Sequence, residues 1–265
     1  MRLGVMLPNE TADADPREIA RLAQHAEALG FASVWLPDHL LPPAPFGSVY
    51  GGVHEALILL AHVAALTERV TLGTSVLVLP LREPVLLAKQ LATLERLAPG
   101  RVILGAGVGW DRDEFAALEV PFTERGKRTD ELIELVAHLH TTGSGGFDGR
   151  FHRVGGGVLA PQPSAPIPLL VGGKSDAALK RAARVGDLWQ AYGVTPDEFR
   201  ALHARLRAFT SGRSVSAGTV INARPDTDWA AELDAWRAAG AEHLAIHPGP
   251  LATAAERLTA AASAG

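Results

Sequence analysis

The chain of 265 residues contains no cysteine, and lysine occurs only at positions 89, 127, 174 and 180. The absence of cysteine excludes disulfide bonds and thiolate chemistry. The net charge is −4 at pH 7 and no basic stripe occurs, which argues against nucleic-acid and anionic-membrane partners. The longest apolar run, residues 56–66, contains His62 and is too short to cross a bilayer. No metal-binding spacing such as His-Glu-x-x-His is present, so no metal site is expected.

The amino-terminal residues enter a strand-like run at once, at 3–7, with no signal-peptide pattern. We therefore expect a soluble cytoplasmic protein.

Short apolar runs alternate with helical patterns along the whole chain. Each run is rich in Val, Leu, Ile and Ala without clean alternation, as in parallel strands that are covered on both faces. The predicted strands are 3–7, 33–36, 70–79, 102–106, 167–171, 188–191, 217–222 and 243–246. Eight strand–helix units in about 250 residues favour a single (β/α)8 barrel domain over residues 1–265, with a doubly wound open sheet as the alternative.

The segment 141–166 departs from this alternation, because it is dense in glycine and proline. It is predicted to be an irregular insertion, with a small hairpin at 147–151 around an Asp-Gly turn. Loops of this length are usually functional or disordered.

Asp38 and His39 follow the second predicted strand, directly after Pro37. The carboxyl ends of barrel strands carry the chemistry of such folds. An imidazole exchanges protons near neutral pH, so His39 is a candidate acid or base. Asp38 could orient His39 or bind a ligand; alternatively, His39 merely ends the strand and Asp38 pairs with an arginine.

Two glycine-containing strand ends are candidate ligand sites. Gly172-Gly173-Lys174-Ser175 opens a helix, where free amides, the helix dipole and a lysine suit a phosphate, although a plain turn explains it equally well. Gly107 and Gly109 precede Trp110 and leave room for a planar ring, unless they only permit tight packing. The remaining strand ends include Gly193, and His247, for which no partner is evident from the sequence.

Taken in order, these segments resemble the bacterial luciferase-like superfamily of flavin and deazaflavin barrels. The resemblance covers nearly the whole chain. Its carriers are the segments 33–39, 70–76, 104–110 with Glu114-Phe115, 124–128, 168–173, 178–183 and 186–189.

The Asp-His strand ending is most similar to the branch that uses the deazaflavin coenzyme F-420, with FMN as the alternative cofactor. The resemblance implies hydride transfer to or from a small organic substrate, with His39 and Asp38 in the catalytic site. It also implies a homodimer and a non-proline cis peptide between Ser75 and Val76. The cofactor-binding residues expected on this basis are Asp38, Ser75, Val76, Gly107, Gly109, Trp110, Gly172, Gly173, Lys174 and Gly193. An FMN-dependent monooxygenase and a non-catalytic barrel are the competing hypotheses, the second because the loops after the first strand and before the last are short.

Overall fold

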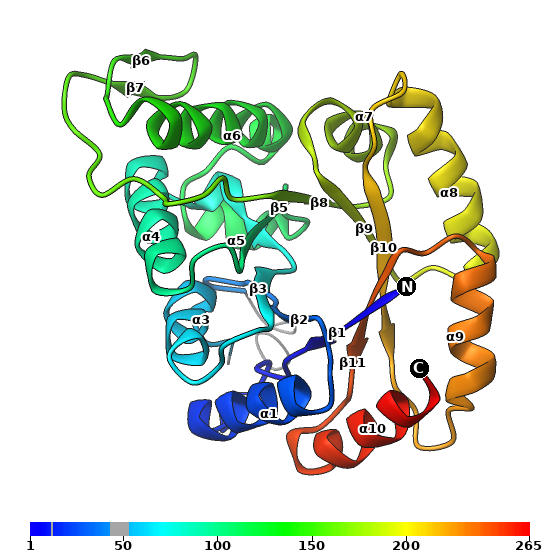
Figure 1. Ribbon diagram of the computed structural model, residues 1–265. Helices are drawn as coiled ribbons and strands as arrows, with labels where there is room; N and C mark the ends of the chain where they lie inside the picture. Colours follow the sequence, from blue (N-terminus) through cyan, green and yellow to red (C-terminus); the bar gives the residue numbers. More distant parts are fainter. Residues whose placement is uncertain (12, 43–52) are drawn as a thin grey trace.

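The computed structural model describes residues 1–11, 13–42 and 53–265. Its main sheet is parallel, and its strands follow one another in the order β3-β2-β1-β11-β10-β9-β8-β5-β4. A further pairing of β3 with β5 closes this sheet into a barrel (Figure 1). The barrel strands are β1 Arg2–Met6, β2 Ser33–Leu36, β3 Thr71–Thr74, β4 Leu77–Val78, β5 Val102–Gly107, β8 Leu169–Gly172, β9 Leu188–Tyr192, β10 Ser216–Asn222 and β11 His243–His247.

Helices surround the barrel and join successive strands (Figure 1). The prediction of a barrel is therefore confirmed, and the open sheet is excluded by the closing pairing. The helices are α1 Pro16–Ala28, α3 Ala56–Ala64, α4 Pro84–Leu97, α5 Arg112–Ala117, α6 Arg125–Thr142, α7 Asp176–Val185, α8 Pro196–Phe209, α9 Trp229–Ala238 and α10 Leu251–Ala264. None of the helices in the described ranges is long and apolar enough to cross a membrane.

The predicted third strand, 70–79, is wrong as one continuous element. It consists of β3 and β4, and the peptide bond between Ser75 and Val76 that separates them is cis, as the family resemblance implied. The last predicted residue, Leu79, instead begins a 3-10 helix at Leu79–Leu81.

The short helix α5 has no counterpart among the predicted elements. It begins at an aspartate, Asp111, whose carboxylate accepts hydrogen bonds from the amides of Asp113 and Glu114. Capping of this kind starts a helix without needing an apolar stripe. Six residues are too few to show a helical period, so the pattern of apolar residues misses α5.

The irregular insertion contains a hairpin that begins where predicted but is longer than the predicted 147–151, because β6 Phe147–Asp148 pairs with β7 Arg153–Val154. Glu131 of α6 holds the hairpin turn in place. Its carboxylate accepts hydrogen bonds from the amides of Arg150, Phe151 and His152.

Two separate sets of apolar side chains form the core. The larger set lies between the barrel and its helices. The smaller set fills the barrel interior and consists of Met6, Trp35, Leu170, Leu188, Val220 and Ala245, against which Val76 and Ile103 pack. Glycines at positions 4 and 73 make room for Trp35, because a Cβ at either would lie within 2.8 Å of its side chain.

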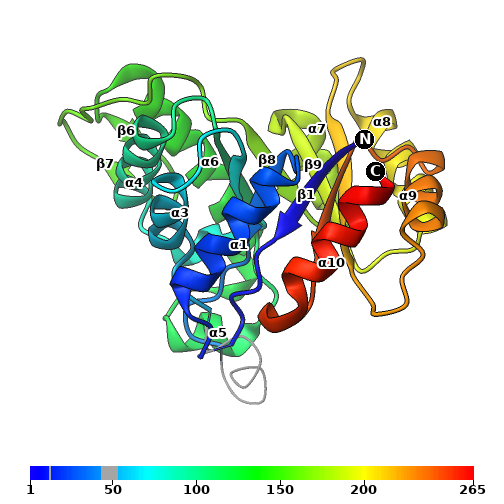
Figure 2. The same ribbon diagram turned by 60° about the horizontal axis from the view of Figure 1, so that its bottom comes forward.

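The interior apolar set divides the inside of the barrel into two ends. We call the end at the carboxyl termini of the strands the mouth, and the end at their amino termini the base. Figure 2 shows α5 at the mouth and both chain ends at the opposite end of the barrel. The expected site residues lie at the mouth, where a site in such a barrel belongs.

Candidate active site

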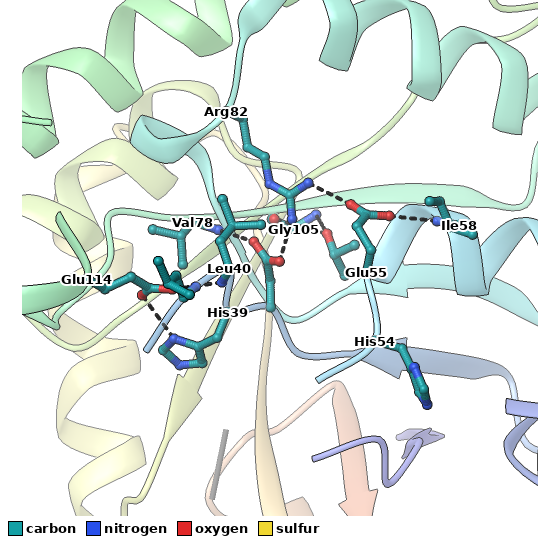
Figure 3. A network of polar contacts seen from close by, with 12 residues as sticks. His39, Leu40, His54, Glu55, Ile58, Val78, Arg82, Gly105 and Glu114 are labelled. Atoms are coloured by element: carbon teal, nitrogen blue, oxygen red, sulfur yellow. Dashed lines mark hydrogen bonds and ion pairs between the residues drawn. The ribbon is translucent and has the colours of Figure 1, made fainter. Parts of the chain in front are cut away.

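Asp38 and His39 both follow β2, but their side chains contact different residues. The His39 imidazole points to Glu114 and away from Arg82 (Figure 3), and its Nδ1 lies 3.0 Å from Glu114 Oε2. The Asp38 carboxylate is instead bound by Arg82 and by the amide of Val78, at 2.9 Å. The structure thus shows Asp38 paired with an arginine and His39 paired with an acid 75 positions further along the chain.

Glu114 is buried on α5 and fixes the segment after β2. One carboxylate oxygen accepts hydrogen bonds from the amides of Leu40 and Leu41, at 2.7 and 3.0 Å, and the other accepts from His39. Burial raises the pKa of Glu114, but the hydrogen bonds from His39 and the two amides more than offset this and lower it overall. Glu114 is therefore a carboxylate near neutral pH, and it selects the His39 tautomer with its proton on Nδ1.

Trp110 lies at the rim of the mouth beside His39. The two rings meet edge to face, with 5.6 Å between their centroids. About half of Trp110 (51%) is exposed, although it is a large aromatic residue. An exposed indole next to a partly buried imidazole offers an apolar wall for a planar ligand.

Asp38 belongs to a charge network with Arg82 and Glu55, and Figure 3 shows the contact between Arg82 and Glu55. The Arg82 guanidinium bridges Asp38 and Glu55, and Glu55 also caps α3 through the amide of Ile58. Burial raises the pKa of Asp38, an effect that Arg82 opposes. Burial would lower the pKa of Arg82, but its two carboxylate partners raise it overall, so Arg82 stays charged.

This network ties the end of β2 to β4 and α3. The Asp38 side chain is only 1% exposed, and its described contacts do not include His39. The geometry therefore gives Asp38 a role in positioning the strand end, and its assignment to catalysis or to cofactor contact stays a prediction.

Val76 projects between two glycines at the mouth. A Cβ at Gly107 would lie 2.3 Å from Val76 Cγ2, and one at Gly172 would lie 2.9 Å from Val76 Cγ1. The missing side chains at Gly107 and Gly172 therefore make room for Val76. Ser75, the neighbouring residue, donates its hydroxyl proton to Gln190 Oε1 across the barrel, at 2.5 Å.

The candidate phosphate site lies across the mouth from β2, where β8 and β9 end. Gly173 has φ +123°, a conformation that disfavours a side chain, and it precedes the N-cap Ser175 of α7. The exposed Lys174 donates to the carbonyl of Gly193 at 3.1 Å.

Gly109, after β5, has φ +76°, and a Cβ there would lie 2.6 Å from Phe115 of α5.

The sequence did not reveal three polar residues of the mouth, namely Glu114 as the partner of His39, Arg82 and Gln190. His247, which was ambiguous, has a partner: its Nε2 lies 2.8 Å from Glu10 Oε1. Within the described part of the chain, no group of three or more His, Asp or Glu side chains could hold a metal ion.

A closed barrel with an imidazole–carboxylate pair and a glycine-lined mouth is typical of an enzyme of the (β/α)8-barrel class. Comparison with known families identifies the family. The model of the luciferase-like monooxygenase family matches residues 1–264. This chain belongs to that family.

Relatives of known sequence agree with this assignment. An uncharacterised protein of Mycobacterium tuberculosis (strain ATCC 25618 / H37Rv) is 39% identical over 199 residues, which cover 70% of this chain and 69% of that protein. An F-420-dependent glucose-6-phosphate dehydrogenase of Beutenbergia cavernae is 36% identical over 240 residues, 85% of this chain and 69% of that enzyme. The corresponding enzyme of Kineococcus radiotolerans is 38% identical over 175 residues, which cover 65% of this chain and 51% of that enzyme.

Solved structures share the fold at lower identity. An F-420-dependent secondary alcohol dehydrogenase, solved with an F-420–acetone adduct, superposes with a TM-score of 0.82 at 18% identity and covers 99% of this chain and 98% of its own. A monooxygenase of Streptomyces bottropensis gives a TM-score of 0.83 at 22% identity, covering 99% of this chain and 98% of its own. At these identities the likeness supports the fold alone.

Proposed function

We propose that this protein is an F-420-dependent oxidoreductase acting on a small organic substrate. The observation that carries the proposal is the His39–Glu114 pair at the mouth, in a family whose relatives include F-420-dependent dehydrogenases. The bound deazaflavin would give or take a hydride. The residues of this chain would supply the proton, the walls of the site and the binding of the anionic side chain.

The described residues fit such a cofactor at two places. Val76, held between Gly107 and Gly172, offers an apolar surface for a planar ring at the mouth. Lys174, Gly173 and the amino-terminal end of α7 offer positive charge for the phosphate of the cofactor side chain. In this proposal Trp110, Gly109 and Gly193, which follow β5 and β9, would border the same opening.

In this proposal His39 handles the proton that accompanies hydride transfer. Because Glu114 accepts the proton of Nδ1, proton exchange with the substrate falls to Nε2. Glu114 also stabilises the imidazolium that forms when Nε2 takes up a proton, as a buried carboxylate does for a catalytic histidine. Glu114 is thus a positioning residue, and His39 is the proposed catalytic residue.

Titration of the purified protein with F-420 and with FMN, followed by absorbance and fluorescence, tests the cofactor. We expect saturable binding of F-420 at least tenfold tighter than that of FMN. Tighter binding of FMN would instead support an FMN-dependent monooxygenase. Binding of neither cofactor would support the non-catalytic barrel and reject the proposal.

We also propose that the protein is a homodimer. Large apolar side chains are exposed on the neighbouring helices α3 and α4, namely Ile58 (70% exposed), Leu86 (56%) and Leu97 (59%). In the proposed dimer these side chains would form part of the interface, where contiguous apolar surface is typical. Light scattering coupled to gel filtration should give twice the monomer mass, and a monomer mass at micromolar concentration would refute the dimer.

A further inference from the structure

Gln190 is a buried polar residue inside the barrel that the proposed mechanism has not used. It lies on β9, two residues beyond Leu188, which belongs to the interior apolar set. Alternate residues of a strand face the same side, so Gln190 also points into the barrel, one layer closer to the mouth than Leu188. The opposite face of β9 carries Trp189, which stacks on Phe199 of α8 outside the barrel.

The side-chain amide of Gln190 is only half satisfied. Its Oε1 accepts the proton of the Ser75 hydroxyl at 2.5 Å, while its buried Nε2 has no hydrogen-bond partner within residues 1–11, 13–42 and 53–265. The residue as a whole is 4% exposed. A buried N–H group without an acceptor costs free energy, and native proteins seldom keep one without a reason.

The surroundings of Gln190 are those of the proposed ring site. Gly172 on β8 is the register partner of Gln190, and the backbone carbonyl of Gln190 accepts the amide proton of Gly173 at 3.1 Å. Gly172 in turn makes room for Val76, the residue next to Ser75. The amide therefore lies among the residues that would surround a heterocycle, and the Ser75 hydroxyl fixes its orientation.

We infer that Gln190 binds the cofactor, with Nε2 donating a hydrogen bond to an acceptor atom of the heterocycle and Ser75 orienting the amide. The inference rests on the proposed function and adds a polar recognition residue to it. Deazaflavin and flavin rings both carry carbonyl acceptors, so Gln190 would recognise a ring of this class. Substrate chemistry would be left to His39.

Replacement of Gln190 by methionine separates this role from a structural one. Methionine has nearly the same length and volume, but it removes the unsatisfied N–H group together with the Oε1 acceptor of the Ser75 hydroxyl. We expect the Gln190→Met variant to bind F-420 at least tenfold more weakly than the wild type. Its melting temperature in the absence of cofactor should fall no further than that of Ser75→Ala, which loses the same hydrogen bond. Ser75→Ala should weaken binding about threefold, because the amide loses its orienting partner.

Thr219→Val is the matched control. Thr219 is likewise buried and polar, but it lies on the adjacent strand β10 and its hydroxyl is satisfied by the carbonyl of Ala191 at 3.1 Å. This variant should lose thermal stability while its Kd for F-420 stays within twofold of the wild type.

The inference is overturned if Gln190→Met binds F-420 within twofold of the wild type, or if its cofactor-free melting temperature falls further than that of Ser75→Ala. If the wild type itself binds neither F-420 nor FMN, the proposed function fails and the inference falls with it. Wild-type binding combined with unaltered binding by the variant rejects the role of Gln190 alone.

Discussion

The mouth and the base of the barrel each contain a buried interior side chain with one unpartnered nitrogen. At the mouth this is Nε2 of Gln190, and at the base it is Nε2 of His243, neither of which has a partner within the described residues. His243 lies two positions before Ala245 of the interior apolar set, on the side away from the mouth. The same kind of unsatisfied group thus occurs on both sides of one apolar layer.

The two groups differ in what can satisfy them. Gln190 lies beside Val76 and Ser75 at the open end, where a ligand can supply an acceptor. His243 lies below the apolar layer, with Ser216 Oγ 3.3 Å from its Nδ1, and burial followed by the charge of Arg2 lowers its pKa to about 4. The comparison predicts that changes at the mouth alter binding and turnover, whereas changes at the base alter stability.

The largest effect is expected from His39→Ala at the mouth. Loss of the proton-handling group should reduce turnover by roughly 10²–10⁴-fold while the affinity for F-420 stays near that of the wild type. The rate is measured as F-420 oxidation or reduction with a substrate found by screening small organic compounds. An unchanged rate would reject the role of His39 in proton transfer.

At the base, stability should depend on pH through His243. Its folded-state pKa of about 4 lies below the ordinary value of 6.5, so its contribution is complete above pH 6.5 and is lost as the pH falls towards 4. This shift corresponds to roughly 3 kcal/mol of unfolding free energy. Urea unfolding of the wild type and of His243→Phe between pH 7 and 4.5 measures it.

His243→Phe should flatten most of that pH dependence, because the phenyl ring has no charged form. His140 and His203, whose pKa values burial also lowers, contribute in the same direction and stay in the variant. Below pH 4.5 the lowered pKa values of Glu95 and Glu131 add a second loss, which both proteins share. Equal slopes for the two proteins above pH 4.5 would contradict the account.

A smaller effect should come from adding one methyl group at either end. At Gly218 a Cβ would lie 2.2 Å from His243 Cδ2, and at Gly107 it would lie 2.3 Å from Val76 Cγ2. Both alanine variants should lose about 1–3 kcal/mol of unfolding free energy through overpacking. Only Gly107→Ala should also weaken F-420 binding, because only there does the displaced side chain border the mouth. Equal losses of affinity would remove the distinction between the two ends.

Much of the fold was predictable because each barrel strand is a short apolar run bounded by helix caps, proline or glycine. Pro16, Pro84 and Pro196 mark helix starts that the structure reproduces. The interruption at Ser75 was not visible in the sequence pattern, because residues 70–74 and 76–79 are both rich in residues typical of strands. The cis peptide bond at this interruption was predicted from the family resemblance instead.

The candidate site was less predictable, because its contacts join distant parts of the chain. Sequence position alone places Asp38 and His39 together, and only the path of the backbone after Pro37 sends one to Arg82 and the other to Glu114. The role of Gln190 could not be predicted from the sequence. A single polar residue within an apolar strand does not reveal which face of the sheet it lies on or which residue it contacts.

The most direct test of the central claim is a crystal structure of the protein with F-420. The account predicts the deazaflavin ring in the mouth against Val76, with the His39 imidazole facing it and the Gln190 amide donating to one of its acceptors. A ring bound elsewhere, or a His39 side chain turned away from the mouth, would contradict the account.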